Sequence, residues 1–178
     1  SRAVKQKYVE WGLSDCEFKI IPNMIDPTFT SSTKVYPPKP SEKHLSNLVD
    51  LVYIGHLRPS KGVKYLIDAM AYLPTKYSLT IVGDGPERDY LEARTSASPA
   101  SQQISFIGKR PYEEISQILQ NSDVFVHPGV WPEPFGRTIL EAMQLCLPVV
   151  ATDIGGPSEI VPQSDLLCNP SDPSSLCE

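Results

Sequence analysis

Residues 48–70 read LVDLVYIGHLRPSKGVKYLIDAM. The run from Leu48 to Gly55 is apolar and rich in β-branched residues, which indicates a buried strand that breaks at the glycine. Beyond the loop, apolar residues recur at helical spacing, at Val63, Leu66, Ile67, Met70 and Leu73. This stretch therefore predicts a strand followed by a helix.

The same alternation continues along the sequence. Further strands are predicted at residues 77–85, 103–108, 123–129 and 147–153, and further helices at 86–94, 111–120 and 137–145. Five short apolar strands separated by segments of helical length require a parallel sheet with helices on both faces. The predicted fold class is α/β, with a doubly wound, Rossmann-like and mostly parallel sheet.

The first 46 residues differ in character from the rest. They contain a predicted helix at residues 2–11 and a predicted strand at 17–21. The stretch at the boundary, residues 28–47, is rich in Pro, Ser, Thr and Lys, as in a solvated linker. Residues 47–178 are the size of one domain with its own core. The sequence starts without Met and ends in SDPSSLCE, a pattern typical of a helix start, so we expect a piece of a longer protein.

Composition narrows the class of partner. The net charge is −5, the sequence pI is about 5.2, and Lys and Arg are scattered, so no nucleic-acid surface is predicted. Small molecules or proteins are the expected partners. No apolar run approaches the ~18 residues of a membrane span. The four cysteines lack C-x-x-C spacing and Cys146 is expected to be a buried thiol, which predicts a cytoplasmic location and no metal site.

Glycines mark one end of the predicted sheet. Four predicted strands end in a glycine or a glycine-containing turn, at Gly55, Gly83, Gly108 and Gly129. Ligands of open α/β sheets bind at the carboxyl ends of the strands. The glycines therefore outline one predicted cleft.

Two glycine-containing loops border this cleft, and neither matches a known phosphate motif. GHLRPSKG, residues 55–62, has the wrong residues on both sides of its Lys for a Walker loop, and VGDGP, residues 82–86, lacks the third glycine of a dinucleotide fingerprint. Arg58 and Lys61 could still hold a diphosphate through charge-assisted hydrogen bonds. An ordinary solvated loop explains the two cations equally well.

Two carboxylates flank a predicted helix start in HPGVWPEPFGRTILEAMQLCLPVVATD, residues 127–153. Glu133 lies in the loop and Glu141 in the helix, with seven residues between them. Each also has an interpretation without a ligand: Glu133 as a carboxylate favoured by the helix dipole, and Glu141 as a solvated helix residue. A helical wheel puts Ile139, Ala142, Met143 and Cys146 on the sheet-facing side and Arg137, Glu141 and Gln144 opposite, so Glu141 is not expected in the core.

The same spacing fits a nucleotide diphosphate. A rise of ~1.5 Å per residue puts Glu141 about 7 Å along the helix from Gly136. Phosphates would bind the amides after Phe135 and Gly136, ribose hydroxyls would reach Glu141, and Glu133 would face the group on the distal phosphate.

WPEPFGRTILEAM followed by LPVVATDIGGPSEIV resembles the signature of retaining GT-B glycosyltransferases of carbohydrate-active family four, or glycosyl transferases group 1. Four earlier segments also resemble the family and occur in its order: YIGHLRPSKGVKYLIDAM, TIVGDGPERDYLE, ISFIGKRPYEEI and DVFVHPG. KIIPNMID resembles the family's passage between its two domains. The resemblance implies that residues 1–46 are the end of the N-terminal domain and the interdomain linker. Residues 47–178 would then be the donor-binding half of a GT-B fold, without its last helix.

The resemblance implies roles for individual residues. Glu141 would bind the ribose, Glu133 would contact the transferred sugar, and Lys61 would stabilise the charge on the departing phosphate. The family usually has Arg where His56 stands, so whether His56 or Arg58 contacts phosphate stays open. It also tends to have Gly at Cys146, which we interpret as a packing adjustment. The other implied donor-binding residues are Gly55, Gly83, Lys109, Arg110, Phe135, Gly136, Arg137 and Thr138, with Gly155 and Gly156 in a loop that closes the site.

The implied activity is transfer of a hexose from a UDP-, GDP- or ADP-sugar, with retention and without a metal or other cofactor. The acceptor, a sugar or a lipid, would bind the N-terminal domain, and a lipid would bring the full protein to a membrane surface; this chain alone is expected to be inactive. An epimerase of the same fold and a non-catalytic nucleotide-binding module stay open as alternatives. A glycosidase is disfavoured, because Glu141 lies too far along its helix to share one glycosidic bond with Glu133.

Overall fold

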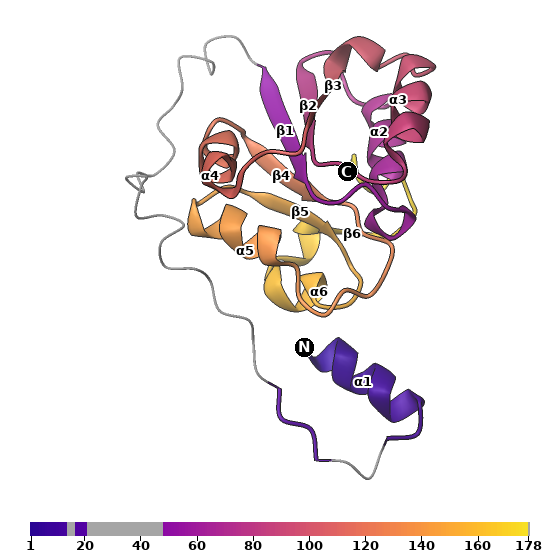
Figure 1. Ribbon diagram of the computed structural model, residues 1–178, viewed down its shortest axis with the longest axis vertical. Coiled ribbons are helices and arrows are strands. Elements are labelled where there is room, and N and C mark those ends of the chain that lie inside the picture. Colours follow the sequence, from indigo (N-terminus) through magenta and orange to yellow (C-terminus); the bar gives the residue numbers. More distant parts are fainter. Residues whose placement is uncertain (14–16, 21–47, 178) are drawn as a thin grey trace.

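The computed structural model describes residues 1–13, 17–20 and 48–177, and its centre is a six-stranded parallel sheet (Figure 1). The strands lie in the order β3-β2-β1-β4-β5-β6, and every neighbouring pair is parallel. The predicted doubly wound, Rossmann-like fold is therefore confirmed. The strands are β1 (Val49–Ile54), β2 (Tyr77–Val82), β3 (Ile104–Gly108), β4 (Val124–His127), β5 (Val149–Thr152) and β6 (Leu167–Cys168).

Helices cover both faces of the sheet. Figure 1 shows α2 and α3 on one face and α4, α5 and α6 on the other. Single-turn 3-10 helices η2 (Pro59–Lys61), η3 (Ser101–Gln103) and η4 (Ser164–Leu166) lie in the connections. The α-helices are α1 (Arg2–Glu10), α2 (Val63–Met70), α3 (Arg88–Ser96), α4 (Tyr112–Gln120), α5 (Arg137–Gln144) and α6 (Pro157–Ile160). None of the described helices is long and apolar enough to cross a membrane.

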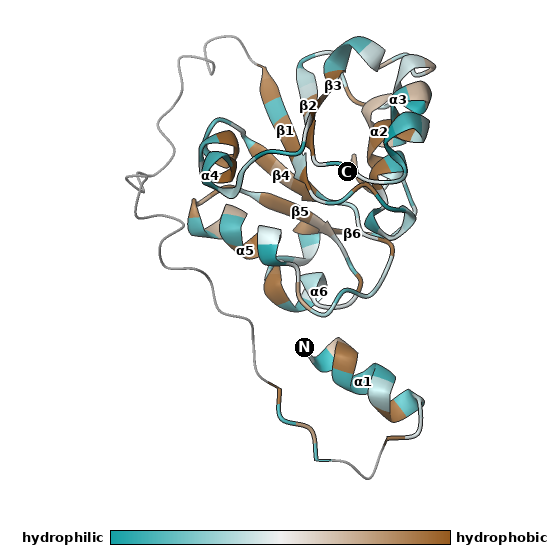
Figure 2. Ribbon diagram, in the orientation of Figure 1, coloured by the Kyte–Doolittle hydropathy of each residue, from teal (hydrophilic) through white to brown (hydrophobic). Residues whose placement is uncertain are grey.

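Strand β1 shows why the strands are apolar almost throughout. Leu51 and Tyr53 pack into the core under α2 and α3, whereas Val52 and Ile54 pack into the core under α4 and α5. All four side chains are buried. Successive residues of a strand point to opposite faces, so a sheet covered on both faces needs apolar residues at nearly every position (Figure 2).

The strand order brings two distant loops together. The chain runs from β1 outward to β3 on one side and from β4 outward to β6 on the other, and β1 pairs with β4 at Leu51–Val124 and Val52–Phe125. The connections after β1 and β4 therefore leave the same edge in opposite directions, which opens a crevice between them. The predicted Lys61 and Glu133 lie in these two connections.

The sequence located all five long strands but misplaced smaller features. Strand β6 was missed, because it has only two residues. Residues 17–20 form no strand, since no described segment pairs with their backbone, and Ile21 and the predicted linker lie outside the described residues. The helix predicted from Pro86 begins at Arg88.

The end of α5 corrects two expectations about Cys146. The thiol expected to be buried is exposed, and the backbone of Cys146 is left-handed, with φ of 59°. Its N–H donates to the Met143 carbonyl at 3.0 Å, and the Leu147 N–H donates to the Ala142 carbonyl at 3.0 Å, the bonding pattern of a Schellman helix end. Glycine suits this position for its conformation, so a packing adjustment is the wrong interpretation of Cys146.

Hydrogen bonds link the N-terminal helix α1 to α6. The backbone N–H groups of Arg2 and Ala3 donate to the Glu159 carboxylate on α6, at 2.9 and 2.8 Å. No residue of α1 is buried. This helix therefore lies outside the two cores of the sheet.

Candidate functional site

A cavity of about 520 Å³ opens at the carboxyl ends of β1, β2 and β3. Ile54, Val82 and Ile115 give it an apolar wall. Its other lining residues include five that the sequence had indicated, namely Gly55, His56, Gly83, Lys109 and Arg110. Its volume and its mixture of apolar and charged lining are typical of a small-molecule site.

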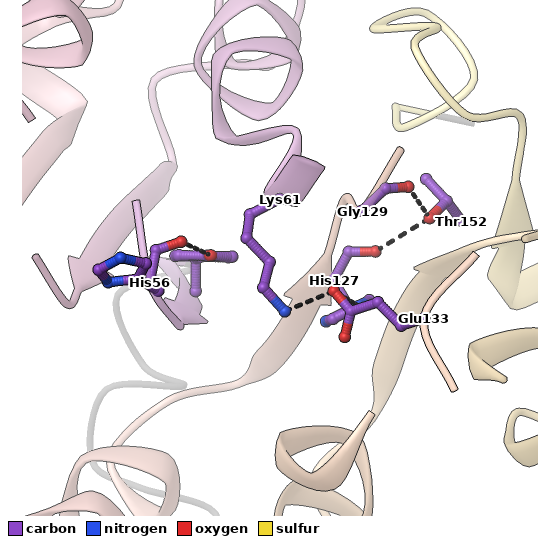
Figure 3. Close-up of polar contacts among 7 residues, drawn as sticks. His56, Lys61, His127, Gly129, Glu133 and Thr152 are labelled. Carbon is purple, nitrogen blue, oxygen red and sulfur yellow. Dashed lines mark hydrogen bonds and ion pairs between the residues drawn. The ribbon is translucent and has the colours of Figure 1, made fainter. Parts of the chain in front are cut away.

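Lys61 and Glu133 form an ion pair next to this cavity (Figure 3). Lys61 ends η2 in the connection after β1, which also carries the cavity residues Gly55 and His56, and Glu133 lies in the connection after β4. The two side chains are 27% and 15% exposed, so a ligand in the crevice could reach both. Residues separated by 72 positions are thus brought into direct contact.

The pair is held because its two loops pack tightly. Gly62 has φ of 67°, and a Cβ there would lie 1.9 Å from the Pro128 carbonyl oxygen, so only glycine allows this approach. The Val130 N–H also donates to the Ser60 carbonyl at 3.0 Å. The backbone therefore fixes Lys61 opposite the loop that carries Glu133.

Thr152 supports the Glu133 loop from the neighbouring strand. This buried residue of β5 donates its hydroxyl to the Gly129 carbonyl at 2.5 Å, and the hydroxyl lies 3.5 Å from the His127 carbonyl oxygen (Figure 3). Further along, the Gly156 N–H donates to the Glu133 carbonyl at 2.7 Å. The loop predicted to close the site, with Gly155 and Gly156, thus contacts the backbone of Glu133. The sequence interpretation missed Thr152.

His127 is the second residue that the sequence interpretation missed. It ends β4, is 3% exposed, and has its Nε2 3.8 Å from Oε1 of Glu133. Neither ring nitrogen has a hydrogen-bond partner in the part of the chain that the structure describes. Burial lowers the pKa of His127 to about 4, although Glu133 opposes the shift, so the ring is neutral at pH 7. A polar residue at the carboxyl end of an apolar strand is the signal that could have found it.

Glu141 corrects the helical-wheel prediction, because it is buried, with 6% exposed. The Tyr112 hydroxyl at the start of α4 donates to its Oε1 at 3.2 Å, and Arg137 Nη2 lies 3.6 Å from the same oxygen. Burial raises the pKa of Glu141, although Tyr112 and Arg137 oppose the shift. The buried residues of α5 thus include Glu141, which Tyr112 links to α4, whereas Met143, expected to face the sheet, is 36% exposed.

The remaining predicted residues lie around these groups. His56 lines the cavity and its carbonyl accepts a hydrogen bond from the buried Tyr53 hydroxyl at 3.2 Å. Arg58 is exposed and does not line the cavity. Gly136, with φ of 101°, directly precedes α5, so the predicted amides of Phe135, Gly136, Arg137 and Thr138 surround the helix start. Within the described residues, no group of three or more His, Cys, Asp or Glu side chains could hold a metal ion.

The sheet, the crevice at its switch point and the paired loops define an α/β protein of the Rossmann-like class with a candidate ligand site at the carboxyl edge. The family model described as glycosyl transferases group 1 matches residues 39–178. The chain belongs to this family, as the resemblance implied.

Curated relatives agree with this assignment. The chain is 33% identical over 130 residues to an uncharacterised glycosyltransferase of Methanocaldococcus jannaschii, covering 71% of this chain and 33% of the relative. It is 31% identical over 164 residues to one component of the human phosphatidylinositol N-acetylglucosaminyltransferase, covering 89% of this chain and 32% of the relative. The chain thus spans about a third of the length of these relatives.

Solved structures show the same architecture. Anabaena HepE in complex with UDP and glucose superimposes with a TM-score of 0.69 at 30% identity, over 85% of this chain and 41% of that one. A sucrose-phosphate synthase from Thermosynechococcus elongatus gives a TM-score of 0.76 at 24% identity, over 97% of this chain and 45% of that one. These coverages agree with the prediction of one half of a GT-B fold.

Proposed function

We propose that this chain is the donor-binding part of an enzyme that transfers a hexose from a nucleoside-diphosphate sugar to an acceptor held by another part of the protein. The ion pair between Lys61 and Glu133 carries the proposal, because it places a cation for phosphate and a carboxylate for sugar side by side at the switch point. Family membership supports it.

The cavity and α5 suggest how the donor lies. The base and ribose would occupy the cavity, beside Lys109 and Arg110. The cavity volume of about 520 Å³ suits a nucleoside. The diphosphate would extend to the start of α5, where amides and the helix dipole favour an anion. Glu141 would exchange its contacts with Tyr112 and Arg137 for the ribose hydroxyls.

The proposed chemistry follows from where charge develops. As the bond to the anomeric carbon breaks, negative charge builds on the departing diphosphate and positive charge on the sugar. Lys61 and the start of α5 would stabilise the negative charge on the diphosphate. His56 is the better placed of the two candidates for a further phosphate contact, because it lines the cavity and Arg58 does not. Glu133, released from Lys61, would orient the sugar. The anomeric configuration would be retained, and Lys61 with the helix dipole would supply the positive charge without a metal.

UDP is the first nucleotide to test, because HepE was solved with it, and GDP and ADP follow. The acceptor would be a sugar or a lipid; the human relative is named for phosphatidylinositol. With a lipid acceptor, the complete protein would work from the cytoplasm at a membrane surface.

Calorimetric titration of the chain with UDP, GDP, ADP and their glucose conjugates tests the donor role. Lys61→Ala is expected to weaken diphosphate binding about ten- to a hundredfold, the loss typical of a charge-assisted hydrogen bond. Lys76→Ala, which removes the same charge at the opposite edge of the sheet beside the start of β2, is the control and should bind as the wild type does. Failure of the wild type to bind any of these nucleotides would sink the proposal.

In the complete enzyme, Glu133→Gln should lower sugar transfer, because its carboxylate faces the sugar. It should not weaken nucleoside-diphosphate binding, because the Gln side chain competes less strongly for Lys61. Unchanged transfer would remove Glu133 from the site. The named relatives are transferases, so an epimerase is not favoured; turnover of a UDP-sugar in the absence of acceptor would restore that alternative.

A further inference from the structure

The buried ring of His127 has two nitrogens without a hydrogen-bond partner among the described residues. Leaving buried polar atoms unpaired is costly, and native proteins rarely do so without a reason. The ring of Phe125, 6.5 Å away between centroids, offers no hydrogen bond. The unpaired nitrogens therefore call for a partner that this arrangement of the site does not supply.

The carboxylate of Glu133 is the group that Nε2 faces. The distance from Nε2 to Oε1 is 3.8 Å, about 0.9 Å longer than an ordinary N–H···O hydrogen bond. Lys61 is bonded to this same oxygen (Figure 3). Lys61 and the imidazole thus approach Glu133 at one atom, and Lys61 holds it.

Gly129 keeps the space between the ring and the carboxylate open. A Cβ at this position would lie 3.2 Å from Nε2 of His127 and 3.8 Å from Oε1 of Glu133. Any larger residue would therefore crowd the path by which the two groups can meet. Thr152 fixes the backbone around this gap through the Gly129 carbonyl.

The charge state of His127 limits what it can do. The ring is neutral at pH 7, since burial lowers its pKa and Lys61 adds to that effect while Glu133 opposes it. A neutral imidazole has one N–H and one acceptor nitrogen. Facing a carboxylate, it can serve as a hydrogen-bond donor through Nε2–H, without adding a positive charge next to Lys61.

We propose that His127 is a positioning residue for Glu133: when a diphosphate draws Lys61 away, Nε2–H of His127 donates to Oε1 of Glu133 and holds the carboxylate toward the sugar. This rests on the proposed function, because it needs a donor whose phosphate competes for Lys61. Nε2 of His127, which has no partner among the described residues while Lys61 and Glu133 are paired, would then be hydrogen-bonded when the donor is bound. Glu133 would keep a partner in both states.

The direct test is ¹⁵N NMR of the histidine rings in the wild-type chain, which has three histidines. Addition of UDP, GDP or ADP should shift the Nε2–H signal of His127 downfield and slow its exchange with water, as expected for a new hydrogen bond to a carboxylate. Glu133→Gln should reduce this shift. A nucleotide that binds by calorimetry but leaves the His127 signal unchanged overturns the inference and leaves the donor role intact. A chain that binds no nucleotide overturns both.

Kinetics of the complete enzyme give the second test. His127→Leu should lower kcat about ten- to a hundredfold, the range for a lost hydrogen bond to a charged group, with little change in KM for the donor. His127→Gln, whose amide can donate from a similar place, should recover most of kcat. The loss of kcat caused by His127→Leu should disappear in the Glu133→Gln background, because the carboxylate that His127 is proposed to hold is already absent.

A matched control separates this role from simple core packing. Thr95 on α3 also has a buried side-chain oxygen without a partner in the described chain, but lies away from the site. Thr95→Val should leave kcat and KM unchanged. If His127→Leu and His127→Gln lose kcat equally and also lose the same thermal stability, His127 acts through packing and the inference is wrong.

Discussion

At the scale of single residues, Cys146 carries a strained backbone that a substitution can relieve. A left-handed conformation costs an L-residue about 1–2 kcal/mol, whereas glycine adds only about 0.4–1 kcal/mol of unfolded-state entropy. Cys146→Gly is therefore expected to raise the free energy of unfolding by about 0.5–1 kcal/mol in urea denaturation. Cys146→Ala removes the thiol but keeps the Cβ and is the control. A glycine variant no more stable than the alanine variant would contradict this explanation.

Thr152 gives a second prediction, for the loop that carries Glu133. Thr152→Val keeps the shape of the side chain but deprives the buried Gly129 carbonyl of its 2.5 Å hydrogen bond. We expect a loss of about 1–2 kcal/mol in the free energy of unfolding, the usual effect of an unpaired buried carbonyl. Thr152→Ser keeps the hydroxyl and should lose less. A loss in Thr152→Ser as large as that in Thr152→Val would contradict this explanation, because Ser keeps the hydroxyl and lacks only the methyl group.

The sequence revealed the charged members of the site but not their supports. Lys61 and Glu133 lie in loops that glycine and proline signals delimit, and helix periodicity places Glu141 one turn beyond a helix start. Thr152 and His127 lie at the ends of apolar strands, where a single polar residue carries no periodic signal. Their importance comes from contacts between β4 and β5, which depend on the strand order.

At the scale of elements, the contact between α4 and α5 predicts an unusual pH dependence. The pKa of Glu141 is raised above 4.5 in the folded chain, so the folded state binds this proton more tightly than the unfolded state. Its contribution to stability is complete below pH 4.5 and is lost as the pH rises through the raised pKa. Glu141→Gln, which stays neutral, should therefore gain stability relative to wild type as the pH rises from 4.5 toward neutrality.

The measurement is urea denaturation across that pH range. Glu113→Gln, a change of the same type at an exposed position in the first turn of α4, is the control and should follow the wild type. A difference between Glu141→Gln and wild type that does not vary with pH would show that the Glu141 carboxyl is not perturbed by its burial under Tyr112.

Elements were predictable where one periodicity continued for several residues. The run before Gly55 and the spacing from Val63 to Met70 located β1 and α2 nearly to the residue. Prediction failed where packing between elements determined which residues are buried. Tyr112 from α4 donates to the buried Glu141 of α5, and a wheel drawn on one helix contains no information about its neighbour.

At the scale of the whole molecule, the site is a consequence of strand order. Lys61 and Glu133 are 72 positions apart, and they meet because β1 and β4 are neighbours at the centre of the sheet while their connections diverge. Any doubly wound sequence has this crevice. In this chain Gly62 lets the two loops touch, so that the crevice begins with a closed ion pair.

The attachment of α1 to the rest of the molecule depends on its first turn. Figure 1 shows α1 apart from the sheet, with its N-terminal end toward α6. The helix has nine residues and none is buried, and isolated helices of this length are marginal in water. The two hydrogen bonds from Arg2 and Ala3 to Glu159, which also place a carboxylate at the positive end of the helix, are therefore the expected source of its order.

Glu159→Ala should raise amide exchange rates in residues 1–13 by about tenfold or more, the loss that corresponds to one charge-assisted hydrogen bond, and leave strands β1 to β5 unchanged. Glu113→Ala, on the exposed surface of α4, should change neither region. Hydrogen exchange followed by mass spectrometry resolves both. Unchanged exchange in α1 would mean that contacts other than Glu159 hold it, and faster exchange in the strands would make Glu159 part of the domain's own stability, because α6 packs on β5.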